Sequence, residues 1–106
     1  RAQAMGLAML GDKIPAEKAV QLGMIWQCVA DEELKTEAAK MAEHLATQPT
    51  YGLSLIKKAI NAAADNNLDE QLILERDLQR LAGRSSDYKE GVQAFMQKRT
   101  PEFRGC

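Results

Sequence analysis

Glycine and proline residues divide this chain into short segments, most of which carry apolar residues at helical spacing. Gly11, Gly23 and Gly83 follow three of these segments, and glycine commonly supplies the left-handed residue after a helix. Pro49 and Pro101 end two others, because the residue before a proline avoids helical backbone. The sequence therefore predicts a succession of short helices separated by tight turns.

The apolar residues are mostly Ala, Leu, Ile and Met, and aromatic residues make up 5% of the chain. That composition favours helices over strands. One stretch, residues 24–29, is β-branched and aromatic, and we expect it to form an extended connector that could pair with a strand. The first two predicted helices run from Arg1 to Leu10 and from Ala16 to Leu22, the second with Pro15 as first residue. The next two begin at the caps Asp31 and Thr50, and they end near Thr47 and at the loop Asn66–Asn67. The last two run from Leu68 to Gly83 and from the cap Asp87 to Thr100. We predict an all-α fold of five or six helices with one short extended segment.

The last predicted helix has two notable features. Asp87 and Glu90, three residues apart, resemble a capping box in which Asp87 replaces the usual Ser or Thr. Val92, Phe95 and Met96 are predicted to form its apolar side.

Charge and cysteine content exclude several classes of protein. Fourteen Lys and Arg against fifteen Asp and Glu leave a net charge of −1, without the strongly basic face of a nucleic-acid-binding domain. No apolar run approaches the ~20 residues of a membrane span, and no leader pattern is present. Cys28 and Cys106 are far apart in the sequence, which favours a reduced, cytoplasmic protein. We expect neither a nucleic-acid nor a membrane partner.

The usual catalytic constellations are missing. His44 is the only histidine and has no identifiable partner, so we predict a surface or boundary residue. No Cys/His spacing suits a metal, and the glycines are too dispersed for a phosphate-binding loop. Glu75 lies on the predicted apolar face of its helix. It is the best candidate for a buried carboxylate, and we expect it to pair with an arginine of a neighbour, such as Arg76 or Arg80.

Phe95, Lys98 and Arg99 allow two interpretations. The two cations complement the negative end of a helix dipole, and that alone accounts for them. Alternatively, an aromatic ring one turn before a lysine could stack on a base while the lysine holds a phosphate. Spacing alone favours the structural interpretation.

The order of segments resembles the C-terminal third of the crotonase family, the enoyl-CoA hydratases and isomerases. Residues 4–19, AMGLAMLGDKIPAEKA, are similar to the family's helix, tight turn and helix. Residues 23–29 are similar to its G-L-V-x-x-V connector. Ser86–Phe103 matches its terminal signature, including E-G-x-x-A-F-x-x-K-R-x-P-x-F. Residues 23–26, 45–53 and 74–86 most resemble the isomerases of bacterial phenylacetate degradation.

The resemblance implies a helical trimerisation domain over residues 1–106, whose last helix covers an acyl-CoA substrate. Lys98 matches the family's lysine that contacts a CoA phosphate, and Phe95 matches a nearby aromatic residue. Where relatives place another aromatic near the adenine, this chain has Leu78–Leu81. The family's oxyanion hole and acidic residues are expected before Arg1, so no catalytic residue is assigned. No cofactor is implied, since the substrate is itself a CoA thioester.

Three hypotheses follow. The first is part of an acyl-CoA isomerase that acts on a ring-epoxide CoA ester and forms a trimer or hexamer. The second is part of an ordinary enoyl-CoA hydratase, which needs two acidic residues elsewhere. The third is a free-standing helical interaction module. Because the chain starts inside a predicted helix, we expect a piece of a longer enzyme, inactive alone, with Met5, Met9 and Trp26 exposed.

Overall fold

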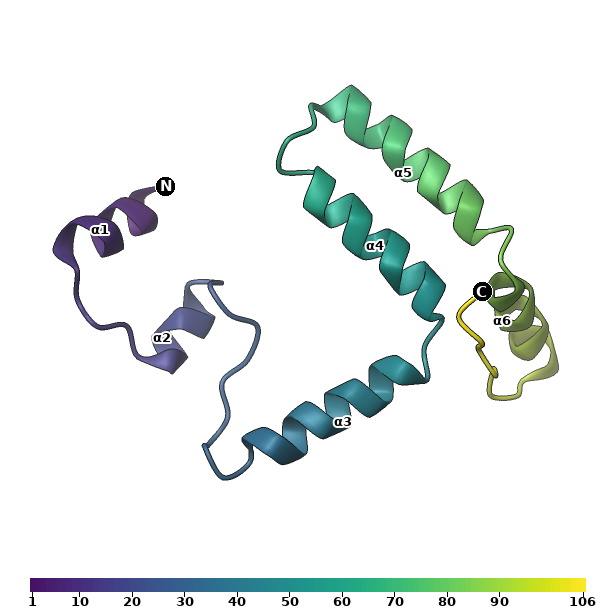
Figure 1. Ribbon diagram of the computed structural model, residues 1–106, viewed down its shortest axis with the longest axis horizontal. Coiled ribbons are helices and arrows are strands. Elements are labelled where there is room, and N and C mark those ends of the chain that lie inside the picture. The colour runs from purple at the N-terminus through teal and green to yellow at the C-terminus, as the bar shows by residue number, and fades with distance from the viewer. The chain divides into compact units, whose positions relative to one another are not determined.

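The protein is all-helical. A computed structural model describes all 106 residues and contains no strand. Six helices follow one another: α1 (Ala2–Leu10), α2 (Ala16–Gln21), α3 (Leu34–Ala46), α4 (Thr50–Ala62), α5 (Leu68–Ala82) and α6 (Ser86–Gln97) (Figure 1). The chain divides into two compact units, residues 1–38 and 39–106. The all-α prediction is confirmed.

The first unit contains α1, α2 and the connector that follows. α1 ends at Gly11, whose φ of 68° is left-handed, and Gly23 has a φ of 71° after α2. Both predicted stops are therefore confirmed. Pro15 is the residue before α2 rather than its first residue. Residues 22–26 form turns and bends, and residues 27–30 have no regular structure. The connector pairs with no strand.

Two predicted helix starts are displaced. α3 begins at Leu34, because residues 31–33 form a turn closed by the Glu33 N–H to the Ala30 carbonyl. Thr50 is the first residue of α4 and not its cap. The cap is Pro49, whose side chain has no atom that could accept an N–H. The predicted end near Thr47 is confirmed, as α3 stops at Ala46.

The helices α4 and α5 form an antiparallel hairpin (Figure 1). Asn67 in its loop caps α5: its side chain accepts the Glu70 N–H, and the Glu70 carboxylate accepts the Asn67 N–H, both at 3.0 Å. Gln71 ties the helices together by donating to the Ala59 carbonyl at 3.1 Å. Leu78, at 6% exposure, is the one large apolar side chain that is buried. It therefore anchors the packing of the hairpin.

The apolar side of α6 is not its buried side. Asp87 and Ala94 are buried, whereas Val92, Phe95 and Met96 are exposed. The cap is also different, because Ser85 accepts the Tyr88 N–H at 3.0 Å. The Asp87 carboxylate does not cap the helix and instead accepts N–H groups from the segment that follows α6.

Large apolar side chains remain exposed on most of the helices. Met5, Met9 and Trp26 are exposed, as expected. The second unit adds exposed residues on α4, α5 and α6: Ile56, Ile60, Leu68, Leu72, Ile73, Leu81, Val92, Phe95 and Met96. Exposed apolar surface on this scale is typical of faces that pack against other protein. None of the helices is long and apolar enough to cross a membrane.

Candidate functional site

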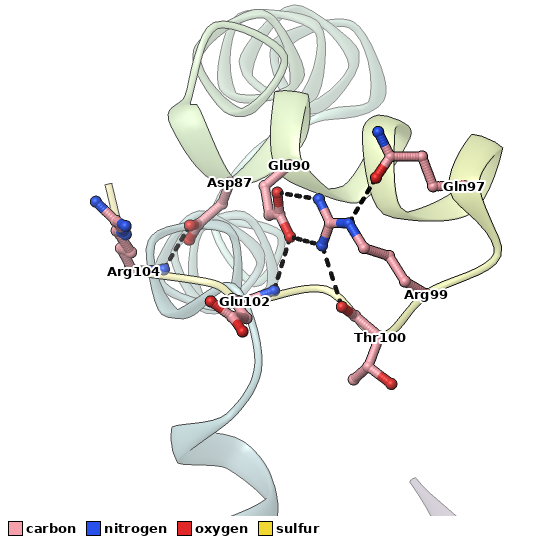
Figure 2. Close-up of polar contacts among 7 residues, drawn as sticks. All are labelled: Asp87, Glu90, Gln97, Arg99, Thr100, Glu102 and Arg104. Atoms are coloured by element: carbon pink, nitrogen blue, oxygen red, sulfur yellow. Dashed lines mark hydrogen bonds and ion pairs between the residues drawn. The ribbon is translucent and has the colours of Figure 1, made fainter.

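The segment after α6, residues 99–106, runs back along that helix toward its first turn. We call it the C-terminal tail. Near its middle, the Glu102 N–H donates to the Glu90 carboxylate at 2.8 Å. Near its end, the Arg104 and Gly105 N–H groups donate to the two Asp87 oxygens at 2.7 and 2.9 Å. Figure 2 shows Asp87 and Glu90 side by side, facing the tail. The two carboxylates fix the register of the tail on α6.

The end of the tail completes the first turn of α6. The Asp87 N–H donates to the Cys106 carbonyl at 3.1 Å, and the Ser86 hydroxyl donates to the same oxygen. N–H groups in the first turn of a helix lack helical partners, and the tail supplies one. Gly105 has a φ of 77°, and a Cβ there would collide with the Thr50 side chain. The tail therefore lies against the start of α4 as well as along α6.

Packing on the same face of α6 involves small residues. The ring of Phe103 lies so close to Gly91 that a Cβ on Gly91 would be 3.6 Å from it. Ala94, one turn further, is 1% exposed. Small residues thus let the tail approach the helix.

Glu90 and Arg99 form a bidentate ion pair. The two terminal nitrogens of the guanidinium donate to the two carboxylate oxygens at 2.5 and 2.8 Å. The Arg99 Nε donates to the Gln97 side chain at 2.8 Å, and one terminal nitrogen also reaches the Thr100 carbonyl at 3.2 Å (Figure 2). The planar guanidinium is therefore held at both ends.

The ion pair shifts the pKa values of both Glu90 and Arg99. The hydrogen bond from Arg99, followed by that from the Glu102 N–H, lowers the pKa of Glu90 from 4.5 to about 2. The hydrogen bond to Glu90 raises the pKa of Arg99 above its usual value. The pair is therefore charged on both sides at neutral pH.

A pH series should reveal this pair. Because the pKa of folded Glu90 is lowered, its stabilising contribution is complete above about pH 4.5 and disappears as the pH falls through about 2. We expect the wild type and Glu90→Gln to differ in the free energy of unfolding at pH 6 and to converge toward pH 2. Denaturant unfolding at several pH values measures this difference. A difference that stays constant from pH 6 to 2 contradicts the assignment, and Glu75→Gln is the matched control.

Lys98 lies between the helix and the tail. It is the only residue other than glycine with a positive φ, at φ 55° and ψ 36°. Its N–H bonds the Phe95 carbonyl at 3.2 Å, and the Arg99 N–H bonds the Ala94 carbonyl at 3.0 Å. These bonds close α6 with a left-handed turn. Lys98 therefore caps the helix with its backbone, and its side chain is exposed.

Phe95, the second residue matched to the family's CoA contacts, is 82% exposed. It lines an apolar groove of about 410 Å³ together with residues that include Pro49, Tyr88 and Phe103. Leu78, which stands near the position of the family's other aromatic residue, is buried in the hairpin instead. Nothing in the geometry tests whether Lys98 and Phe95 bind CoA, and both remain predictions.

The other candidate residues take simpler roles. Glu75 is exposed and accepts a hydrogen bond from Gln71 at 2.8 Å, so the prediction of a buried carboxylate is wrong. Arg76 and Arg80 instead contact Asp77. His44 is exposed, as predicted. No group of three or more His, Cys, Asp or Glu side chains is placed to hold a metal.

Sequence reasoning missed the role of Asp87 and Glu90. The interpretation as a capping box was wrong, because Ser85 caps α6 and Asp87 binds tail N–H groups. The signal that could have found this role is the spacing of Asp87, Glu90, Gly91 and Ala94. These positions recur every three or four residues and so share one helix face. Lys98 and Phe95 are exposed, as is Arg99.

The whole chain, residues 1–106, matches the family model described as "Enoyl-CoA hydratase/isomerase". The helical fold and the signature at the end of α6 agree with that match. The chain belongs to the enoyl-CoA hydratase/isomerase family, which is also called the crotonase family.

The chain is also similar to individual proteins and crystal structures of this family. The chain is 64% identical over 105 residues to the 1,2-epoxyphenylacetyl-CoA isomerase of Escherichia coli K12, covering 99% of this chain and 40% of the relative. A crystal structure of enoyl-CoA hydratase subunit I from Geobacillus kaustophilus HTA426 matches with a TM-score of 0.94 and 38% identity, over 100% of this chain and 41% of that one. An enoyl-CoA hydratase from Polaromonas sp. JS666 matches with a TM-score of 0.89 and 36% identity, over 98% and 40%. The chain thus spans about 40% of the length of these relatives.

Proposed function

We propose that residues 1–106 form the C-terminal helical domain of an acyl-CoA isomerase that acts on ring-1,2-epoxyphenylacetyl-CoA in phenylacetate catabolism. The 64% identity to a relative with that activity in its name carries the proposal. The family's reaction needs an oxyanion hole for the thioester enolate and an acid or base to move a proton. We assign neither to residues 1–106 and propose that both lie elsewhere in the full-length enzyme. We also propose a cytoplasmic location, which the free thiols of Cys28 and Cys106 support.

The domain would have two tasks in the full-length enzyme. The first is self-association into a trimer or hexamer, supported by the exposed apolar residues of α4 and α5. The second is to cover the CoA moiety of the substrate. For that task we propose that Lys98 contacts a CoA phosphate and that the Phe95 ring lies beside it. Support comes from the exposure of both side chains at the end of α6.

The test of substrate class uses the full-length enzyme. We expect it to isomerise the ring-epoxide CoA ester faster than it hydrates a simple enoyl-CoA, while the 106-residue chain alone turns over neither. Product analysis by chromatography of CoA esters measures both reactions. A preference for hydration assigns the chain to the hydratases, whose crystal structures at 36–38% identity make them the second candidate.

The test of Lys98 compares two substrates of the full-length enzyme. Removing the ammonium by Lys98→Gln should raise the KM for a CoA thioester about fivefold to tenfold, because a contact between an exposed cation and a phosphate contributes about 1 kcal/mol. The KM for the matching pantetheine thioester, which lacks the adenosine phosphates, should not change. Lys98→Arg keeps the charge and serves as the control. Equal effects on both substrates would exclude the phosphate contact.

A further inference from the structure

The conformation of Lys98 needs an explanation. A lysine is rarely found with positive φ, because its Cβ then crowds the backbone. Such a residue persists where its surroundings fix the conformation, and these places are often functional. Lys98 is such a residue, because its φ is 55°. A glycine would adopt the same φ without strain. The surroundings that fix it are therefore of interest.

Contacts on the C-terminal side of Lys98 provide that constraint. The next residue, Arg99, is held by Glu90 through two hydrogen bonds and by Gln97 through a third. The main chain beyond it is held by the same carboxylate, which accepts the Glu102 N–H. Glu90 therefore connects α6 to both the side chain and the backbone that follow Lys98.

Glu90 and Asp87 contact different parts of the C-terminal tail. The Glu90 side chain is 21% exposed and that of Arg99 is 39% exposed, so the pair is partly shielded from water. Asp87 holds the far end of the tail, at Arg104 and Gly105. Of these two carboxylates, Glu90 is therefore the one that contacts Arg99, the residue next to Lys98.

We propose that the ion pair between Glu90 and Arg99 positions Lys98 for the phosphates of CoA by fixing the left-handed turn at the end of α6; this rests on the proposed function. Glu90 and Arg99 are positioning residues and do not themselves touch the substrate. Without the pair, the turn at Lys98 opens and its ammonium no longer has a fixed location. Binding of the phosphate-bearing part of CoA weakens, while the pantetheine arm and the reacting acyl group bind as before.

The experiment is a double-mutant cycle in the full-length enzyme, with Glu90→Gln, Lys98→Gln and the double variant. Each is assayed with the CoA thioester and with the pantetheine thioester. We expect Glu90→Gln to raise the KM for the CoA thioester about threefold to tenfold, with kcat and the pantetheine KM unchanged. In the Lys98→Gln background the same change should have no further effect. Glu102→Gln, in the same tail, is the matched control, because the Glu102 contact to Glu90 uses its backbone N–H.

Different outcomes separate the two proposals. If Lys98→Gln leaves the KM values for both thioesters unchanged, or changes both by the same factor, the proposed CoA contact is wrong. If Lys98→Gln has its effect and Glu90→Gln does not, the positioning role is wrong. If Glu90→Gln acts equally with and without Lys98, or equally on both substrates, its role is structural and the inference is overturned. Should Glu90→Gln fail to fold, Arg99→Lys retains the charge, loses the bidentate geometry and undergoes the same test.

Discussion

Replacing Leu78 by alanine should lower the free energy of unfolding of the 106-residue chain by about 2–3 kcal/mol. Truncating a buried leucine removes its apolar contacts and leaves a cavity, and such changes typically cost about 2–5 kcal/mol. Leu78 is 6% exposed between α4 and α5, where no other large apolar side chain is buried. Because a two-helix layer can partly collapse onto the gap, we expect the lower part of that range. Urea unfolding followed by circular dichroism measures the loss.

Leu72→Ala is the matched control for this change. Leu72 lies in the same helix and is 55% exposed, so the substitution changes helix propensity equally and removes few contacts. Its expected effect is below about 1 kcal/mol. Both variants should be compared at a concentration where sedimentation shows a single species, because exposed apolar faces favour association. Equal losses for the two variants would contradict the assignment of Leu78 as the anchor of the hairpin.

Replacing Asp87 by alanine should destabilise the chain by about 2–4 kcal/mol. The Asp87 carboxylate is 3% exposed and accepts the N–H groups of Arg104 and Gly105. Hydrogen bonds to a charged group contribute about 1.5–3 kcal/mol each, and an N–H group left buried without a partner adds to the loss. Asp87→Asn keeps the shape but retains only one acceptor oxygen, so we expect about half the effect.

Amide hydrogen exchange locates the effect of Asp87 directly. The Arg104 and Gly105 amides should exchange faster in both Asp87 variants, whereas the amides in the middle of α5 should change only by the global loss of stability. Asp77→Asn is the control, because Asp77 pairs with Arg76 on the surface and such pairs contribute little. Unchanged exchange at Arg104 and Gly105 would show that Asp87 does not hold the tail.

Local signals in the sequence predicted most of the helices but not their packing. Gly11 and Gly23 marked helix ends correctly, because positive φ is a property of the residue itself. Asp87 was misassigned because Ser85 and Asp87 are both residue types that cap helices, and Glu90, three positions after Asp87, favoured Asp87. The structure uses Ser85, and only the position of the tail decides between them. Asn67 shows the reverse case, as a residue expected in a loop is the cap of α5.

The candidate site was predictable only in part. The family signature placed Lys98 and Phe95 at the end of α6, but spacing alone favoured a structural role for the cations. The same signature contained Glu90 and Arg99, whose ion pair joins residues nine apart through a reversal of the chain. Helical periodicity describes one face of one helix and carries no information on a segment that folds back on it. Ala94 was missed as the buried residue for the same reason.

The tail has a consequence for how the protein folds. Its contacts with α6 join residues that are 9 to 20 positions apart in the sequence. Loops of about ten residues close in roughly 10–100 ns, and contacts between near neighbours in sequence form before distant ones because less chain entropy is lost. The turn at Lys98 should therefore form early, as soon as α6 is helical. Its geometry would then be in place before the self-association proposed above.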